Sequence, residues 1–176
     1  RGRLYKLLHH LPNEATIVFC NQKDTADALT REIKNEGMKA VKFHGGMDQA
    51  RRESALAQFR NGSSTILVST DLAARGLDIP ELNHVIHYDH SESEAQFRHR
   101  SGRTARVARE GNVYLIPGEQ DDPAFLSESA IDLVPETTNK RPKPDWVTFY
   151  VSAGKKNKVN KIDLVGFFLQ VCRLDK

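Results

Sequence analysis

The chain has 176 residues, of which 39% are hydrophobic and 28% charged, values typical of one globular domain with some chain left over. No apolar run approaches the roughly 20 residues that cross a bilayer, so we expect a soluble, cytoplasmic protein without membrane contact. The net charge of +3 does not by itself indicate nucleic acid. Cys20 and Cys172 lack the spacing of a metal site, and we expect no metal ligands in this chain.

Four helices are expected in the first part of the chain. They span residues 3–11, 24–35, 49–59 and 94–102. The first is predicted by leucines at helical spacing. The second has Ala28, Leu29 and Ile33 on its expected inward face and a glycine stop at Gly37. Asp48 is a suitable N-cap for the third.

Five short runs rich in β-branched and aromatic residues alternate with these helices and predict strands. They span residues 16–20, 39–44, 65–69, 84–88 and 112–116. The first run is wholly apolar, which is typical of a strand buried on both faces of a parallel sheet. Strands that alternate with helices over short loops indicate an α/β fold with a mostly parallel sheet covered on both sides. Binding residues in such sheets lie at the carboxyl ends of the strands, here Asn21-Gln22, His44-Gly45-Gly46, Thr70-Asp71 and Asp89.

The pattern weakens after residue 116. We expect a main domain over residues 1–134 with a short helix at 119–129, a polar linker over 135–145, and a further segment over 146–176. The last segment predicts a strand (146–151), a basic loop (154–158) and a helix (161–169). One strand and one helix cannot bury enough surface to be stable alone. We therefore expect this segment to dock on the main domain, to pair with another chain or to be mobile.

An arginine-rich stretch lies at residues 97–106. Arg100, Arg103 and Arg106 follow one another at steps of three, so their guanidiniums can converge on one side of a helix end. Because each guanidinium binds phosphate oxygens two at a time, the cluster predicts a site for a polyanion. A solvated basic face is the alternative.

Two stretches resemble motifs of the DEAD-box RNA helicases. Residues 70–78 match motif V, T-D-x-x-A-R-G-[IL]-D, at every fixed position, and residues 99–106 match motif VI, H-R-x-G-R-x-G-R, except at Ala105. Ser101 and His90-Ser91 also depart from the residues usual in the family. The resemblance covers roughly residues 3–129. It implies a RecA-like three-layer α/β/α sandwich, the C-terminal half of an ATP-dependent RNA helicase.

By this resemblance, ATP and Mg²⁺ bind in a cleft between this domain and an N-terminal RecA-like domain of the same protein. The loop that cradles the ATP phosphates and the acidic motif that holds Mg²⁺ are both absent from this sequence. This chain alone is therefore expected not to hydrolyse ATP. Arg103 and Arg106 would be arginine fingers on the γ-phosphate, with His99 in the catalytic group. Asp78 would bind the ribose beside Gly76. A purely structural role is the alternative for His99.

The resemblance also implies contacts to RNA, both single-stranded and duplex. The residues concerned are Asn21, Gly45, Gly46, Gln49, Arg52 and Thr70, together with Lys155 and Lys156 of the basic loop. Hydroxyls, backbone amides and helix N-termini bind phosphate and sugar without reading sequence. Phe19 is a candidate to stack under an arginine, although a buried strand phenylalanine is usually part of the core.

Residues 146–176 resemble the start of the DbpA-like RNA-binding domain, an RRM-type module, which implies ribosomal RNA as partner and a role in ribosome assembly. Two other functions remain open: a related superfamily 2 motor that acts on DNA, and a non-catalytic RNA-binding module. The Q-x-x-R pattern of Gln49 and Arg52 favours RNA over DNA. Arg103 and Arg106 favour a motor over a passive module, because fingers serve no purpose without a γ-phosphate.

Overall fold

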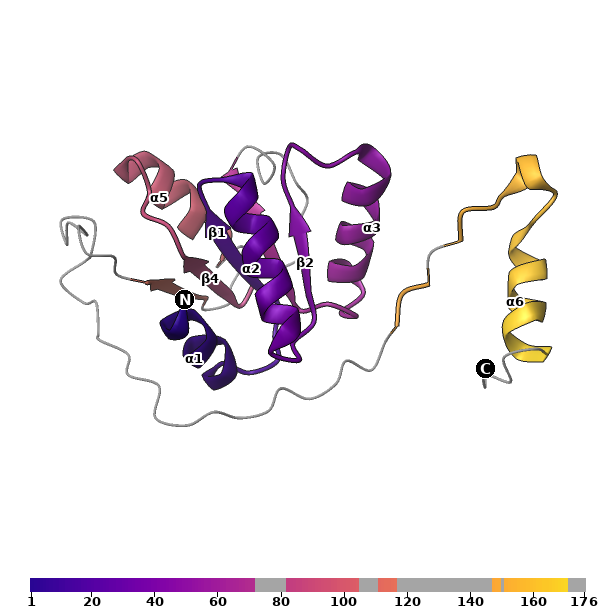
Figure 1. The fold of residues 1–176 in the computed structure, drawn as a ribbon, viewed down its shortest axis with the longest axis horizontal. Helices are drawn as coiled ribbons and strands as arrows, with labels where there is room; N and C mark the ends of the chain where they lie inside the picture. Colours follow the sequence, from indigo (N-terminus) through magenta and orange to yellow (C-terminus); the bar gives the residue numbers. More distant parts are fainter. Residues whose placement is uncertain (72–81, 105–110, 117–146, 150, 171–176) are drawn as a thin grey trace.

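The computed structural model of the protein describes residues 1–71, 82–104, 111–116, 147–149 and 151–170. Their strands form a five-stranded sheet in the order β2-β3-β1-β4-β5 (Figure 1). The strands are β1 (Thr16–Cys20), β2 (Ala40–Phe43), β3 (Ile66–Thr70), β4 (His84–His87) and β5 (Asn112–Leu115). Each neighbouring pair is parallel, so all carboxyl ends meet at one edge. The five predicted strands and their parallel arrangement are confirmed.

Helices cover both faces of this sheet. The described α-helices are α1 (Gly2–His10), α2 (Lys23–Asn35), α3 (Gln49–Arg60), α5 (Glu94–Ser101) and α6 (Lys161–Gln170). Leucines of α1 and the inner face of α2 pack with Val18 and Val68 on one side of the sheet. Ala55 and Phe59 of α3 pack with Ile17 on the other side. The result is the expected three-layer α/β/α sandwich.

The sequence explains where these elements begin and end. Asp48 caps α3 by accepting a hydrogen bond from the backbone N–H of Arg51 at 2.8 Å, as predicted. Gly37, with φ of +80°, lies just beyond the end of α2 and allows the chain to turn back into β2. On α2 the prediction was wrong for Ala28, which is only partly buried, whereas Ala26 is fully buried. Ala26, not Ala28, shares the helix face of Leu29, Thr30 and Ile33.

All five residues of β1 and of β3 are buried. Their side chains alternate between the two cores, so Ile17 and Leu67 face α3 while Val18 and Val68 face α2. Each fully buried side chain of this size stabilises the fold by roughly 1.5–3 kcal/mol relative to exposure. The central strands therefore form a rigid base for the loops that follow them.

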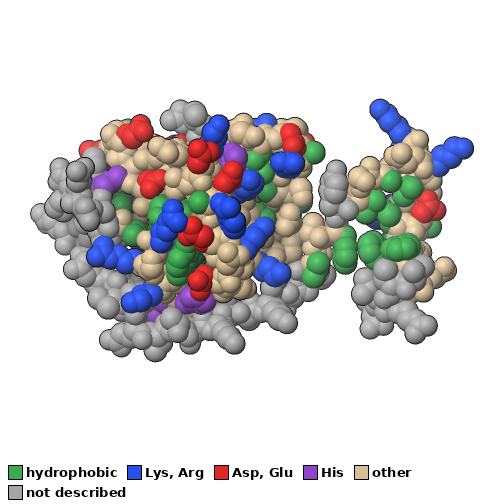
Figure 2. Space-filling view, viewed as in Figure 1, with side chains coloured by type: hydrophobic (Ala, Val, Ile, Leu, Met, Phe, Trp, Pro, Cys, Tyr) green, Lys and Arg blue, Asp and Glu red, His purple; other side chains and the backbone are tan. Residues whose placement is uncertain are grey.

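The C-terminal described segment differs from the rest. It contains the 3₁₀ turn η2 (Lys155–Asn157) and the predicted helix α6, but the strand predicted at 146–151 is wrong for residues 147–149 and 151, which pair with no strand. Thr148 contacts the α3–β3 loop, where its Oγ1 accepts from Asn61 Nδ2 at 2.8 Å and lies 2.5 Å from Ser63 Oγ. Figure 2 shows hydrophobic side chains gathered on this segment, and Phe149 is 61% exposed.

Several predictions concern residues that the structure leaves undescribed. The helix at 119–129, the linker at 135–145, and Gly76, Asp78 and Arg106 lie outside the described residues. No helix among the described residues is long and apolar enough to cross a membrane.

Candidate functional site at the carboxyl ends of the strands

Arg100, in the last turn of α5, joins the carboxyl ends of three strands. Its side chain is fully buried. The guanidinium donates from Nε and Nη2 to the two carboxylate oxygens of Asp71, at 2.7 and 2.5 Å. It also donates to Asn21 Oδ1 at 2.7 Å and to the carbonyl of Asp89 at 3.1 Å. Asp71 follows β3, Asn21 follows β1 and Asp89 follows β4, so one side chain fixes α5 across this edge of the sheet.

The guanidinium of Arg100 also lies 5.4 Å from the centre of the Phe19 ring. The predicted stacking of Phe19 under an arginine is therefore confirmed, and this contact adds a cation–π attraction to the ion pair. The expected convergence of Arg100 with Arg103 is wrong, because Arg100 is buried while Arg103 is partly exposed, and Arg106 lies outside the described residues. Arg100 points into the domain because the Asp71 carboxylate neutralises it there.

Arg103 and His99 lie at the end of α5. Arg103 follows Gly102, the C-cap of the helix. Its Nη2 donates to Nε2 of His99 at 2.7 Å, so the imidazole accepts and holds the guanidinium. His99 is exposed and Arg103 is partly exposed. The structure thus brings these two predicted residues together at the surface.

The β2–α3 connection brings together four of the predicted RNA-binding residues. Gly45, Gly46 and Gln49 are exposed at the end of β2 and the start of α3. Arg52 Nη2 donates to Gln49 Oε1 at 2.8 Å, and Gln49 in turn donates to Glu53 at 2.7 Å. The Q-x-x-R pair is therefore a hydrogen-bonded unit on the first turn of α3.

Asn21 and Thr70 lie at the carboxyl ends of β1 and β3, where Asn21 is exposed and Thr70 is buried. The Asn21 amide donates to the carbonyl of His90 at 2.9 Å and accepts from Arg100. Its backbone N–H donates to Asp89 at 2.8 Å. Thr70 is 9% exposed. Asn21 holds loop ends together in this structure, and an RNA contact by either residue stays a prediction.

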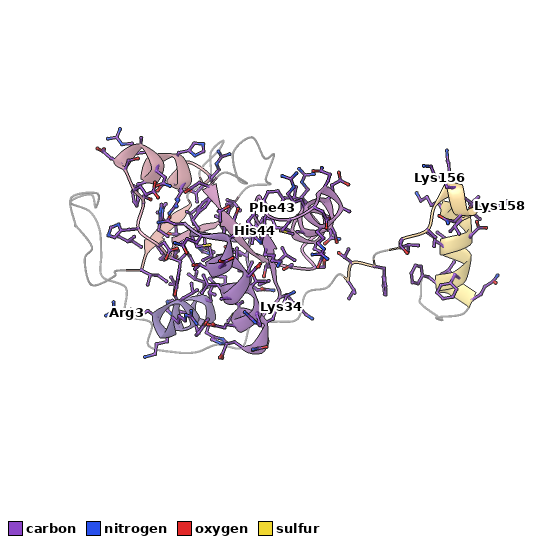
Figure 3. All side chains as sticks on the ribbon, turned by 45° about the horizontal axis from the view of Figure 1, so that its top comes forward. Arg3, Lys34, Phe43, His44, Lys156 and Lys158 are labelled. Atoms are coloured by element: carbon purple, nitrogen blue, oxygen red, sulfur yellow. The ribbon has the colours of Figure 1, made fainter. Side chains whose placement is uncertain are left out.

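Lys155 and Lys156 belong to the C-terminal segment. Lys155 and Lys156 are both exposed, and Figure 3 labels Lys156 and Lys158 where they project from the turn before α6. Among the described residues, no hydrogen bond or ion pair joins Lys155 or Lys156 to the strand ends. On the face of the main domain seen in Figure 2, lysines and arginines are mixed with acids rather than gathered in one patch.

A buried histidine network under α5 was not foreseen. His87 ends β4, with Ser101 Oγ 3.2 Å from its Nε2 and Ser91 Oγ 3.4 Å from its Nδ1. Its ring stacks on Phe97 at 4.5 Å between centroids. Burial, aided by the charge of Arg100, lowers the pKa of His87 to about 4. The sequence signal was the two serines at positions where the family usually has other residues.

A family model described as helicase conserved C-terminal domain matches residues 1–108. DEAD-box ATP-dependent RNA helicase 21 of Oryza sativa subsp. japonica is 44% identical over 110 residues, which cover 62% of this chain and 15% of that protein. The pre-mRNA-splicing ATP-dependent RNA helicase prp28 of Aspergillus fumigatus is 41% identical over 130 residues, which cover 70% of this chain and 16% of that one. The chain thus spans about a sixth of the length of these relatives.

Solved structures agree with the fold. The yeast DEAD-box splicing factor Prp28 aligns with a TM-score of 0.65 and 34% identity over 70% of this chain and 28% of that one. The C-terminal domain of the DEAD-box protein Dbp5 aligns with a TM-score of 0.61 and 30% identity over 67% of this chain and 69% of that one. The five-stranded parallel sheet is therefore that of a RecA-like domain. The chain belongs to the helicase conserved C-terminal domain family, as the C-terminal domain of a DEAD-box RNA helicase.

Proposed function

We propose that this domain supplies arginine fingers and half of the RNA-binding surface of an ATP-dependent helicase that opens short RNA duplexes. The observation that carries the proposal is the Arg100–Asp71 ion pair, which fixes α5 at the carboxyl edge of the sheet. This clamp leaves Arg103, one turn further on, at the surface with His99. A rigidly mounted guanidinium at a domain surface is what an arginine finger requires.

Bound ATP would be the substrate: water attacks the γ-phosphorus, the bond from that phosphorus to the bridging oxygen breaks, and ADP leaves. Arg103 has donors that fit phosphate oxygens, and we assign it and Arg106 to stabilising the charge that develops on the γ-phosphoryl group. His99 would orient Arg103 through their hydrogen bond. Asp78, next to Gly76 in the chain, would accept from the ribose hydroxyls.

Magnesium belongs to the other half in this proposal. Among the described residues, no three His, Cys, Asp or Glu side chains lie close enough together to hold a metal ion. The N-terminal RecA-like domain is the partner that would complete the site.

RNA would bind across the same edge of the sheet. The Gly45-Gly46 turn, the Gln49–Arg52 pair and the N-terminus of α3 offer backbone N–H groups and a guanidinium to phosphates. Asn21 and Thr70 would add contacts to RNA at the neighbouring strand ends. Lys155 and Lys156 would add an electrostatic attraction for the RNA phosphates. Such contacts carry no sequence information, which suits an enzyme that opens many duplexes.

The test is ATP hydrolysis by this chain joined to its N-terminal half, with single-stranded RNA, single-stranded DNA or no nucleic acid. We expect RNA alone to stimulate, and Arg106→Ala and Arg103→Ala to lower kcat by about 10³-fold or more. Arg98→Ala is the matched control, because Arg98 lies on α5, the helix that precedes Arg103, in an exposed pair with Glu94. Equal stimulation of ATP hydrolysis by DNA would identify a motor that acts on DNA. Binding of RNA without ATP hydrolysis would identify a non-catalytic RNA-binding module.

Two RNA classes are candidates for the physiological target. The resemblance of residues 146–176 to a DbpA-like domain supports ribosomal RNA, ribosome assembly and a cytoplasmic site of action. The prp28 relatives are named as pre-mRNA-splicing helicases, which supports pre-mRNA instead. Sequencing the RNA crosslinked to the whole protein in cells decides between them.

A further inference from the structure

A buried histidine supports the turn that we propose to contact RNA. His44 follows β2 and its side chain is only 6% exposed. Figure 3 labels it beside Phe43 at the end of this strand. The backbone N–H of Gly46 donates to His44 Nδ1 at 3.2 Å. On the other side of the ring, Nε2 lies 3.0 Å from Oδ1 of Asp27, a residue of α2.

These two contacts fix the tautomer of His44. Because Nδ1 accepts a hydrogen bond from a backbone N–H, it carries no proton, and the ring proton lies on Nε2. Nε2 therefore donates to the Asp27 carboxylate. Lys42 donates to the same oxygen of Asp27 at 2.5 Å. The hydrogen bonds from Lys42 and His44 lower the pKa of Asp27 against the opposing effect of burial, so this acceptor stays ionised.

The two glycines of the turn have different surroundings. A Cβ added to Gly46 would lie 3.2 Å from Nδ1 and 3.4 Å from Cε1 of His44, so the ring packs directly against Gly46. The stem of Lys23 is next, at 3.5 Å from the same point. A Cβ on Gly45 would meet nothing within 4 Å. Gly46 is thus the anchored side of the turn, and Gly45 is the side open to a ligand.

We propose that His44, oriented by Asp27, is a positioning residue for RNA binding. It holds the Gly45-Gly46 turn in one shape, so that its backbone can approach a phosphate without first being ordered. This matters because paired glycines have more backbone freedom to lose than any other residues. The inference rests on the proposed RNA contact of this turn.

The choice of variants follows from the geometry of the ring. In His44→Asn, the amide Oδ1 takes the place of Nδ1 and can still accept from Gly46. In His44→Gln, the longer amide reaches toward Asp27 and leaves the Gly46 N–H without its acceptor. Asp27→Ala removes the group that orients the ring. Asp24→Ala, at an exposed position of the same helix, is the control.

Steady-state ATP hydrolysis by the protein with both halves gives the functional readout. His44→Gln is expected to raise the RNA concentration for half-maximal rate about tenfold, the effect of losing about one hydrogen bond. Asp27→Ala should raise the RNA concentration for half-maximal rate by a smaller factor. For both variants, the KM for ATP and the kcat at saturating RNA should stay within about twofold of the parent, since the motif VI residues are unaltered. His44→Asn keeps the acceptor for Gly46 but loses the bond to Asp27, so it should change the RNA requirement no more than Asp27→Ala does, and Asp24→Ala should behave like the parent.

A spectroscopic readout separates this inference from the proposed function. Nitrogen-15 NMR of this chain without RNA should show His44 protonated at Nε2 alone, and the Gly46 amide proton protected in the parent and in His44→Asn but not in His44→Gln. A proton on Nδ1, or an unchanged RNA requirement in a folded His44→Gln variant, would overturn the inference. If the parent shows the expected NMR signature but no stimulation by RNA, the proposed function is what fails.

Discussion

Buried polar side chains beneath the carboxyl edge bind one another instead of water. His87 contacts two serines and an aromatic ring, and it has no hydrogen bond to a carboxylate of the described residues. The thiol of Cys20 donates weakly to the carbonyls of Gln22 and Ser69, and burial raises its pKa to about 12. Both groups are therefore neutral in the folded protein at neutral pH, and neither is suited to acid–base or nucleophilic chemistry.

The lowered pKa of His87 predicts how stability depends on pH. Above pH 6.5, His87 is neutral in both the folded and the unfolded chain, so its burial carries no protonation cost. As the pH falls from 6.5 to about 4, only the unfolded chain takes up this proton, and stability falls. The loss is on the order of 3 kcal/mol by pH 4. Urea unfolding at pH 7.5, 6, 5 and 4 measures it.

The control for this pH dependence is a matched pair of histidine variants. His87→Gln removes the titrating ring and should flatten the stability profile between pH 6.5 and 4, even though its packing cost lowers stability at every pH. His9→Gln, at a partly exposed position of α1, should leave the slope unchanged. A slope that survives in His87→Gln would assign the effect to other groups.

At the scale of elements, α5 is held mainly at its C-terminal end. The helix has eight residues, and Arg100 is its one fully buried side chain. Gln96 adds a hydrogen bond to Asp71, the same carboxylate that binds Arg100. A short polar helix of this kind has little apolar surface to fix it, so its position depends on one ion pair and on Phe97 stacked against His87.

Replacing Arg100 tests this dependence. Arg100→Met leaves Asp71, whose side chain is 12% exposed, as a carboxylate without its cation. We expect a loss of about 3–5 kcal/mol in the free energy of unfolding in urea, because breaking one side of a buried pair strands the other charge. Arg98→Met, which breaks a pair exposed by 78% and 59%, should cost less than about 1 kcal/mol. Equal losses in the two variants would contradict the conclusion that the Arg100–Asp71 ion pair holds α5 in place.

The Arg100–Asp71 ion pair could not be predicted from the sequence, whereas much of the fold could. The elements of the main domain followed from hydrophobic periodicity, because β1 and α2 each have one simple burial pattern. The placement of residues at the carboxyl edge followed from the parallel topology. Which arginine turns inward did not follow, since Arg100 and Arg103 have the same spacing and chemistry. That choice depends on Asp71, which is distant in sequence and accepts two hydrogen bonds from Arg100.

At the scale of the whole molecule, the described members of the two hydrophobic cores all belong to the main domain. Their buried members run from Leu4 to Ile86 in one core and from Ile17 to Val85 in the other. Residues 147–149 and 151–170 of the C-terminal segment contribute no member to either core. Within the part of this segment that the structure describes, the hydrogen bonds to the main domain are those of Thr148 with Asn61 and Ser63. Its own apolar side chains remain in solvent, with Ile162 at 80% exposure.

A chain ending at residue 134 should therefore fold as stably as the whole. We expect its free energy of unfolding to lie within about 1 kcal/mol of the parent, because the exposed bonds of Thr148 exchange for bonds to water. We also expect the shorter chain to bind less of the dye ANS, since the exposed side chains of residues 147–167 are gone. Thr148→Val in the whole chain controls for the hydrogen bonds alone and should leave dye binding unchanged. A loss of several kcal/mol on truncation would mean that the C-terminal segment is part of the folded core, and the boundary at residue 134 would then be wrong.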